Sequence, residues 1–233
     1  MAESWAVTID ALPALLRGVV TTLFLTGLSG LWGMALGSLL GIARCSKFVP
    51  LRWITRAYVD FFRGTPLLVQ LFMIYFGLPA IAVQWNTSLT FDRFVAGVIA
   101  LSLNSAAYIA EIVRAGIQSI EPGQHEAAQA LGLRPLQVLR FVIFPQALRR
   151  VIPPLGNELI TMLKDTSLVA VIGLEELFRE GQLIVAQNYR AFEIYTAVAL
   201  IYLVLTLLTS QILSQVERWT SPASAVHSRR NSR

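Results

Sequence analysis

Long apolar stretches, separated by clusters of charged residues, are the feature that most constrains the fold of this chain. Of its 233 residues, 55% are hydrophobic and 14% are charged, which is typical of a polytopic membrane protein rather than a soluble domain. A helix that crosses the hydrocarbon needs about 20 mostly apolar residues. Five segments meet or nearly meet that requirement: 19–42, 57–79, 94–117, 151–173 and 194–216. The sequence therefore predicts an all-α membrane protein with five transmembrane helices.

Lys and Arg are distributed unevenly over the connections between these segments. Residues 44–56, 114–150 and 218–233 hold thirteen of them, whereas the N-terminus and the 80–93 and 174–190 loops together hold four. Cytoplasmic connections carry the excess of positive charge, so the N-terminus is predicted to be outside and the C-terminus in the cytoplasm. The net charge of +5 is explained by these membrane-edge residues, because they flank apolar runs and form no single stripe that nucleic acid would require.

The two ends of the chain have their own signals. No Lys or Arg precedes Arg17, so the first apolar segment lacks the basic region of a signal peptide and is expected to stay in the mature protein. The C-terminal stretch, 218–233, is rich in Ser and Arg and is predicted to be a disordered cytoplasmic tail without an assigned function. The single cysteine, Cys45, excludes an intrachain disulfide and provides no metal-binding cluster.

Small and helix-breaking residues mark two of the predicted spans. Gly33, Gly37 and Gly41 recur at a spacing of four in the first span, which lets another helix backbone approach closely. Arg63 and Pro66 interrupt the start of the second span, and proline has no backbone N–H to donate. The second span is therefore expected to be irregular, with a short interfacial helix at its beginning.

The polar connection 118–150 is predicted to contain two short helices joined by a tight turn. Pro122 and Pro135 stand at helix starts, Gly132 ends the first helix, and the second is expected to stop before Pro153 and Pro154. The first helix has a face of small and apolar residues beside Glu126, formed by Ala127, Ala128 and Leu131. The second repeats Leu136, Leu139 and Ile143 at helical spacing. This shape suits insertion into a groove of another protein, although an interfacial hairpin resting on the membrane fits the periodicity equally well.

Four spaced motifs resemble those of a known family. The run from Glu126-Ala127-Ala128 through Gly132 to Val142 and Phe144-Pro145 resembles the EAA loop of ATP-binding-cassette (ABC) importer permeases. Val142 and Phe144 stand where that pattern more often has Ile and Leu, which are exchanges between apolar residues. Residues 62–70 (FRGTPLLVQ), 104–114 (NSAAYIAEIVR) and 164–168 (KDTSL) are similar to the polar amino acid branch of that family. The resemblance covers nearly all of residues 15–217.

The resemblance implies a type I ABC importer permease fold over residues 1–217, with 118–150 as the loop that an ATPase subunit grips. The coupling residues that it implies are Glu126, Ala127, Ala128, Leu131 and Gly132. It also implies a bacterial inner-membrane assembly with two ATPase subunits, an identical or sister permease chain and an extracytoplasmic solute-binding protein. The chain contains no Gly-rich P-loop. ATP and Mg²⁺ are therefore expected in the partner ATPase, and this chain is predicted to be neither an enzyme nor a cofactor-binding protein.

Polar side chains within predicted spans are candidates for a substrate path, because ionisable groups are costly there. In the fourth span, four side chains share one helix face that follows a loosened stretch around Pro153 and Pro154: Glu158, Thr161, Met162 and Asp165. In the third span, Asn104, Tyr108 and Glu111 share another face. The residues predicted to contact substrate are Glu158, Asp165, Thr161, Met162, Asn104 and Tyr108.

Structural roles are the alternative for several of these residues. Asp165 and Lys164 could neutralise each other, Asn104 and Tyr108 could hold helices together, and a structural ion pair or interface anchor is favoured for Glu111 and Arg114.

Two acidic groups on one cavity favour a cationic ligand, which leads to the hypothesis that the cargo is a polar and specifically a basic amino acid. Every amino acid carries an ammonium group, however, and a binding protein could set the specificity.

A channel or a proton-coupled secondary transporter would also use buried carboxylates, but the EAA-like loop and the odd number of spans without an internal repeat argue against it. A purely scaffolding subunit would have no use for buried Glu158 and Asp165.

Overall fold

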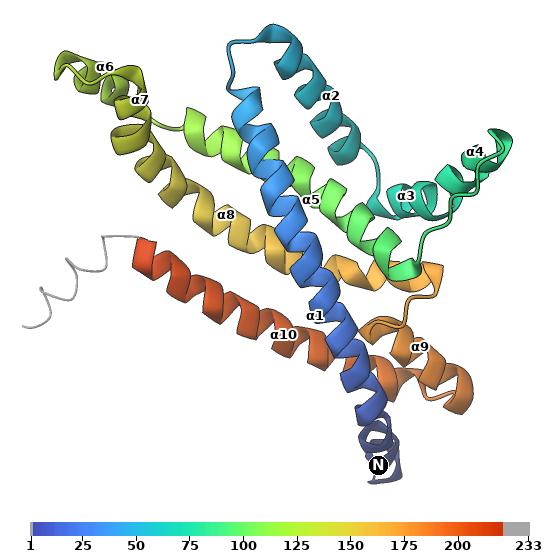
Figure 1. The fold of residues 1–233 in the computed structure, drawn as a ribbon. Helices are drawn as coiled ribbons and strands as arrows, with labels where there is room; N and C mark the ends of the chain where they lie inside the picture. Colours follow the sequence, from blue (N-terminus) through green and yellow to red (C-terminus); the bar gives the residue numbers. More distant parts are fainter. Residues whose placement is uncertain (1, 221–233) are drawn as a thin grey trace, which may run out of the picture.

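The computed structural model describes the backbone of residues 2–220 and the side chains of residues 7–218, and every regular element in this range is helical. Of the predicted tail, residues 221–233 lie outside the described residues. The elements, in chain order, are α1 Ala2–Arg44, α2 Val49–Gly64, α3 Leu67–Phe72, the π-helix η1 Met73–Gly77, α4 Leu78–Gln84, α5 Arg93–Gln118, α6 Pro122–Ala130, α7 Pro135–Val138, the π-helix η2 Leu139–Ile143, α8 Phe144–Asp165, the 3-10 helix η3 Thr166–Ile172, α9 Leu177–Asn188 and α10 Ala191–Thr220. The predicted all-α class is confirmed (Figure 1).

Four helical stretches among the described residues are long and apolar enough to cross a membrane. They are Val7–Arg44, Leu67–Gln84, Arg93–Gln118 and Ala191–Arg218. The predicted spans 19–42, 94–117 and 194–216 fall within three of them. The predicted fourth span, 151–173, is helical as the second half of α8 followed by η3, but it carries polar residues such as Glu158 and Asp165 and is not among these four. A fifth crossing therefore stays a prediction.

The predicted second span, 57–79, differs most from the structure. Helix α2 ends at Gly64, Thr65 is extended with φ −119° and ψ 146°, and α3 begins only after Pro66. The residue before a proline is pushed out of the helical region, and proline donates no hydrogen bond to the preceding turn. The apolar span consequently runs over Leu67–Gln84, and α2 is a separate amphipathic helix.

The first and third long helices pack along a seam of glycines. A Cβ atom added at Gly37 would lie 2.6 Å from the Cβ atom of Ile109, and one at Gly41 would lie 2.7 Å from the Cβ atom of Val113. At Gly33 the nearest atom is the Cβ atom of Ser105, at 3.3 Å. The prediction that this repeat brings another helix backbone close is confirmed, and the partner is α5.

Two apolar clusters hold the remaining elements to this pair. One joins α1, α3, α5, α8 and η3 through buried residues that include Leu25, Leu71, Leu101, Met162 and Val169. The other joins the start of α1 to α9 and α10 through Leu15, Leu177 and Ile194, among others. The core is thus distributed along the helix interfaces, while large apolar side chains elsewhere face outward, as expected where the solvent is lipid.

A buried carboxylate ties the loop before α9 to two long helices. Glu176 is fully buried, accepts hydrogen bonds from the backbone N–H groups of Phe178 and Arg179, and accepts one from the Tyr202 hydroxyl at 2.7 Å. The N–H of Leu177 donates to Thr22 Oγ1 at 3.2 Å. Burial raises the pKa of Glu176, and these hydrogen bonds oppose part of that rise.

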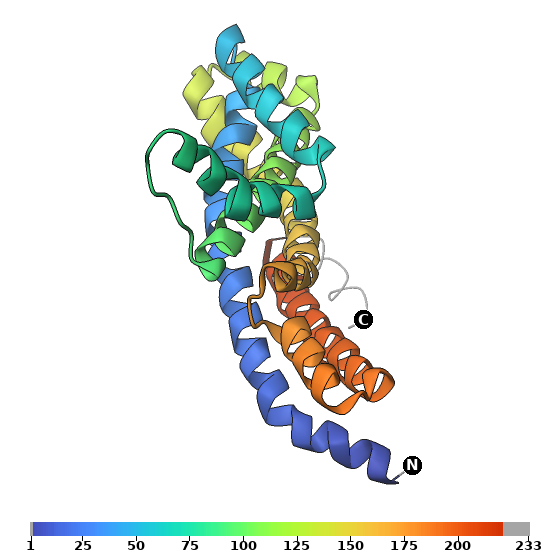
Figure 2. The same cartoon turned by 90° about the vertical axis from the view of Figure 1, so that its right-hand side faces the viewer.

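The helix ends separate into two groups. The C-terminal end of α1, the start of α2 and the α6–α7 hairpin lie together at one end of the molecule, whereas the N-terminus and α9 lie at the other (Figures 1 and 2). The first group contains two of the three Lys- and Arg-rich connections.

Candidate functional site

The acidic face predicted on the fourth span contacts α5 through a serine. Ser105 Oγ donates a hydrogen bond to Glu158 Oε1 at 2.9 Å. Asp165, the last residue of α8, is half-buried, and Thr161 is exposed. Met162 is 3% exposed and is buried in an apolar cluster, so it belongs to the core.

The side chain of Asn104 forms a hydrogen bond to Gln70, which lies just after the break between α2 and α3. Its amide donates to Gln70 Oε1 at 3.0 Å, and Gln70 Nε2 in turn donates to the carbonyls of Phe62 and Thr65 at 2.9 and 3.0 Å. These carbonyls lack their usual helical donors because Pro66 interrupts the helix. The arrangement fits the alternative in which Asn104 holds helices together. Sequence reasoning missed Gln70, although an amide four residues after a helix-breaking proline is a signal for such a cap.

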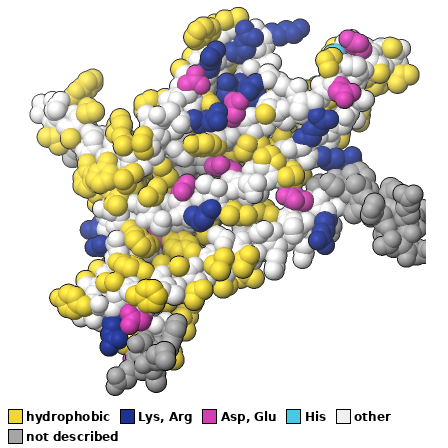
Figure 3. Space-filling view, turned by 180° about the vertical axis from the view of Figure 1, so that it is seen from behind, with side chains coloured by type: hydrophobic (Ala, Val, Ile, Leu, Met, Phe, Trp, Pro, Cys, Tyr) yellow, Lys and Arg dark blue, Asp and Glu magenta, His cyan; other side chains and the backbone are white. Residues whose placement is uncertain are grey.

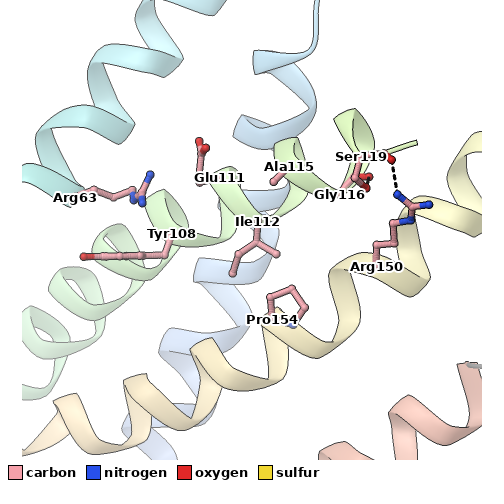
Figure 4. A pocket seen from close by; sticks show the side chains of 9 residues that line it. All are labelled: Arg63, Tyr108, Glu111, Ile112, Ala115, Gly116, Ser119, Arg150 and Pro154. Carbon is pink, nitrogen blue, oxygen red and sulfur yellow. Dashed lines mark hydrogen bonds between the residues drawn. The ribbon is translucent and has the colours of Figure 1, made fainter. Parts of the chain in front are cut away.

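A cavity of about 470 Å³ lies between the end of α2, α5 and α8, and its walls are drawn in Figure 4. Its polar and aromatic lining includes Arg63, Tyr108, Glu111, Ser119 and Arg150, with Pro154 on the α8 side. Tyr108 follows Ser105 by three residues, and Pro154 precedes Glu158 by four. The cavity therefore adjoins the Ser105–Glu158 pair, one helical turn closer to the α6–α7 hairpin.

Arginines dominate the charge of this cavity. The Arg63 guanidinium lies over the ring of Tyr108, 5.4 Å from its centroid (Figure 4). Arg150 donates to the backbone carbonyl of Ser119 and so connects α8 to the end of α5. Neither arginine was singled out as a site residue from the sequence. An arginine within a predicted span is itself a functional signal, and Arg63 lies within the predicted span 57–79.

Glu111 is held by arginines from two helices. Arg44 Nη1 lies 2.5 Å from Glu111 Oε2, and Arg114 pairs with the same carboxylate from the next turn of α5. This geometry fits the structural ion pair favoured for Glu111 and Arg114, with Arg44 of α1 as an additional partner.

The hairpin between α5 and α8 contains the predicted local features. Helix α6 begins at Pro122 and α7 at Pro135, and Gly132 has a φ of +78°, which favours glycine. The prediction that the second helix stops before Pro153 and Pro154 is wrong. Helix α7 continues through η2 into α8, which contains both prolines. Buried neighbours on α8, Ala147, Val151 and Gly156, provide packing that offsets the lost hydrogen bonds, about 3 kcal/mol for an interior proline.

The hairpin tip exposes apolar side chains. Leu131 is 82% and Leu136 is 74% exposed, and Ala127 is exposed as well. Hydrophobic side chains are visible on this hairpin in Figure 3, at the upper right. Ala128, in contrast, is 3% exposed, so the predicted common face of Ala127, Ala128 and Leu131 is divided between the hairpin interior and its surface. Exposed apolar groups gathered on a projecting element indicate a contact surface for another protein or for the membrane.

Comparisons with known proteins agree on one family. Residues 33–222 match the family described as the binding-protein-dependent transport system inner membrane component. The glutamine transport system permease protein GlnP of Escherichia coli (strain K12) is 44% identical over 218 residues, which cover 94% of this chain and 98% of that protein. The arginine transport system permease protein ArtQ of Bacillus subtilis (strain 168) is 41% identical over 214 residues, or 92% and 95% of the two chains.

A solved structure shares the fold as well as the sequence. The crystal structure of an amino acid ABC transporter with histidines contains a chain that is 42% identical, with a TM-score of 0.83, over 91% of this chain and 96% of that one. The family match spans most of the chain, and the relatives align over nearly their whole lengths. This chain therefore belongs to the family of inner-membrane components of binding-protein-dependent transport systems.

Proposed function

We propose that this chain is the permease subunit of an ABC importer that carries polar amino acids across the bacterial inner membrane. The observation that carries the proposal is a set of polar groups beside α5: the Ser105–Glu158 pair adjoins the Arg63–Tyr108 cavity, and the hairpin beyond it exposes apolar side chains. We propose that these polar groups form a path for the solute and call it the polar path. A path for a charged solute and a separate docking element are the two parts that such a subunit needs. The relatives that transport glutamine and arginine support this class of cargo.

The partners follow from the same arrangement. The hairpin around Leu131 is proposed to dock on an ATPase subunit that binds ATP and Mg²⁺. A second permease chain, identical or related, is proposed to complete the polar path. An extracytoplasmic binding protein delivers the amino acid. The similar solved chain comes from an amino acid ABC transporter, which supports an ATPase partner.

Charge along the path fits a zwitterionic cargo. Glu158 and Asp165 are proposed to attract the ammonium group or a basic side chain, and Arg63 to bind the carboxylate. Glu111 lines the same cavity but is paired with Arg44 and Arg114, and among the described residues no carboxylate lies within ion-pair distance of Arg63. A guanidinium binds a carboxylate through two parallel hydrogen bonds, so the substrate can supply the missing partner.

Uptake by the reconstituted complex tests this function. Vesicles containing the permease and its ATPase, supplied with the binding protein, are expected to accumulate labelled polar amino acids only when the ATPase can hydrolyse ATP. Asp165→Asn and Arg63→Gln are each expected to reduce uptake about tenfold or more, because each leaves a buried charge of the substrate unpaired. The matched controls are Asp10→Asn and Arg190→Gln, two exposed residues outside the lining of the cavity.

The outcomes separate the alternatives. Uptake driven by a proton gradient without the ATPase would identify a secondary transporter. Normal uptake by Asp165→Asn would remove that residue from the path, and competition by unlabelled amino acids identifies whether the preferred cargo is basic.

A topology experiment tests the orientation. We propose that the N-terminus is outside and that the hairpin and the C-terminus are cytoplasmic, because basic residues concentrate near the hairpin end of the molecule. A reporter that is active only in the cytoplasm is expected to work when fused after Arg218. A reporter that is active only outside is expected to work when inserted beside Trp85, with immunoblots confirming full-length fusions. The reverse pattern would place the hairpin out of reach of an ATPase.

A further inference from the structure

A second cavity lies where α1 and α5 end beside the first turns of α2. Its volume is about 280 Å³, and we name it the arginine pocket after its lining. The lining residues are Arg44, Arg52, Trp53, Arg56, Arg114 and Gln118. Four of these six are arginines and none is acidic, so the pocket can bind an anion.

The arginines keep an excess of positive charge after their internal ion pairs are counted. Arg44 and Arg114 share one carboxylate, that of Glu111, and Arg56 pairs with Asp60 at 3.3 Å on an exposed surface. Within the described residues, no carboxylate lies at ion-pair distance from Arg52. Four guanidinium groups therefore face two carboxylates, and the shared Glu111 fixes the positions of two of them.

The pocket lies at the boundary of the apolar helices. Arg44 is the last residue of its candidate span, and in the preceding turns Leu39 and Ile42 are 66% and 57% exposed. On α2, Trp53 and Ile54 are 67% and 69% exposed. In Figure 3, Lys and Arg side chains gather at the top of the molecule next to hydrophobic side chains. Guanidinium groups thus stand beside apolar surface, as at the edge of a bilayer, where tryptophan is also enriched.

We propose that the arginine pocket binds the phosphate head group of an anionic phospholipid. A guanidinium matches a phosphate with two parallel hydrogen bonds, and basic pockets between transmembrane helices bind lipid head groups. The exposed apolar side chains of α1 and α2 contact the acyl chains of the same lipid. They distinguish this ligand from free phosphate, which uses only the guanidinium groups.

Lipid binding to the intact permease–ATPase complex tests the proposal. The complex in detergent is titrated with phosphatidylglycerol or with phosphatidylcholine, and native mass spectrometry counts the lipids bound. The expected preference for phosphatidylglycerol is about tenfold or more, and it decreases as salt is raised. The double variant Arg52→Gln/Arg56→Gln, which leaves the Glu111 ion pairs intact, is expected to lose this preference. Arg149→Gln/Arg218→Gln removes two exposed arginines outside the pocket and is expected to retain it.

Three outcomes would overturn the proposal. Equal binding of the two lipids by the unsubstituted complex, or an unchanged preference in the double variant, excludes the pocket as a lipid site. Displacement of phosphatidylglycerol by an equal concentration of inorganic phosphate identifies a free-anion site instead. If the double variant does not retain its ATPase subunit, Arg52→Gln alone gives the same comparison, with a smaller expected loss of about threefold or more.

Discussion

Replacing Gly37 by Val is expected to lower the accumulation of the folded permease several-fold or more. A Cβ atom at this position would lie 2.6 Å from the Cβ atom of Ile109 and 2.7 Å from the carbonyl oxygen of Ala106, and valine adds two further methyl groups. The backbones of α1 and α5 would have to separate along their seam. Overpacking of a close-packed site costs about 1–3 kcal/mol and occasionally more, against a total stability of about 5–15 kcal/mol.

The milder variant Gly37→Ala gives a measurable comparison. It is expected to lower the thermal unfolding midpoint of the detergent-solubilised protein, because even one methyl group meets backbone and a branched side chain. The matched control is Gly27→Ala, for which no atom lies within 4 Å of the added Cβ. Alanine has the higher helix propensity, so the control is expected to be neutral or slightly stabilising. Equal midpoints for the two variants would mean that the seam is looser than these distances require.

Leu131→Asp is expected to disconnect ATP hydrolysis from transport. Leu131 is 82% exposed at the hairpin tip, so the substitution itself costs the fold no more than about 0.5 kcal/mol. In an ATPase cleft, a buried carboxylate without a partner weakens binding by about 2 kcal/mol or more. Hydrolysis stimulated by loaded binding protein is expected to fall to the unstimulated level, and uptake by roughly tenfold or more.

Two further variants serve as controls for Leu131→Asp. Leu89→Asp, in the loop before α5, changes a partly exposed leucine far along the chain from the hairpin and is expected to leave stimulated hydrolysis unchanged. Ala128→Arg is expected to disrupt the hairpin itself, because Ala128 is buried within it. Normal stimulation and uptake in Leu131→Asp would favour the alternative of a hairpin that rests on the membrane.

Local chemistry made the hairpin predictable. Proline at a helix start and glycine at a position with positive φ act within one turn, so Pro122, Pro135 and Gly132 could be interpreted without knowing their neighbours. The same reasoning gave a wrong prediction at Pro153 and Pro154, where a helix end was expected. The helix through them is stabilised by packing against distant segments, and such tertiary contacts override a local preference.

Periodicity predicted faces but not their surroundings. It placed Ala127, Ala128 and Leu131 together, yet only the fold determines that Ala128 points inward while Leu131 points outward. Met162 fell on the acidic face by spacing, although the apolar cluster with Leu25 and Leu71 draws it into the core. The Ser105–Glu158 bond joins residues 53 positions apart, so no local signal could identify the partner of that carboxylate.

The amide network at the α2–α3 break has a consequence for how this protein is made. A chain leaving the insertion machinery must satisfy every backbone carbonyl that enters lipid, and an interrupted helix would otherwise need water or another subunit to do so. Here Gln70, oriented by Asn104, supplies the donors from within the same chain. The carbonyls of Phe62 and Thr65 are therefore capped within a single chain and need no donor from a second copy or an ATPase subunit.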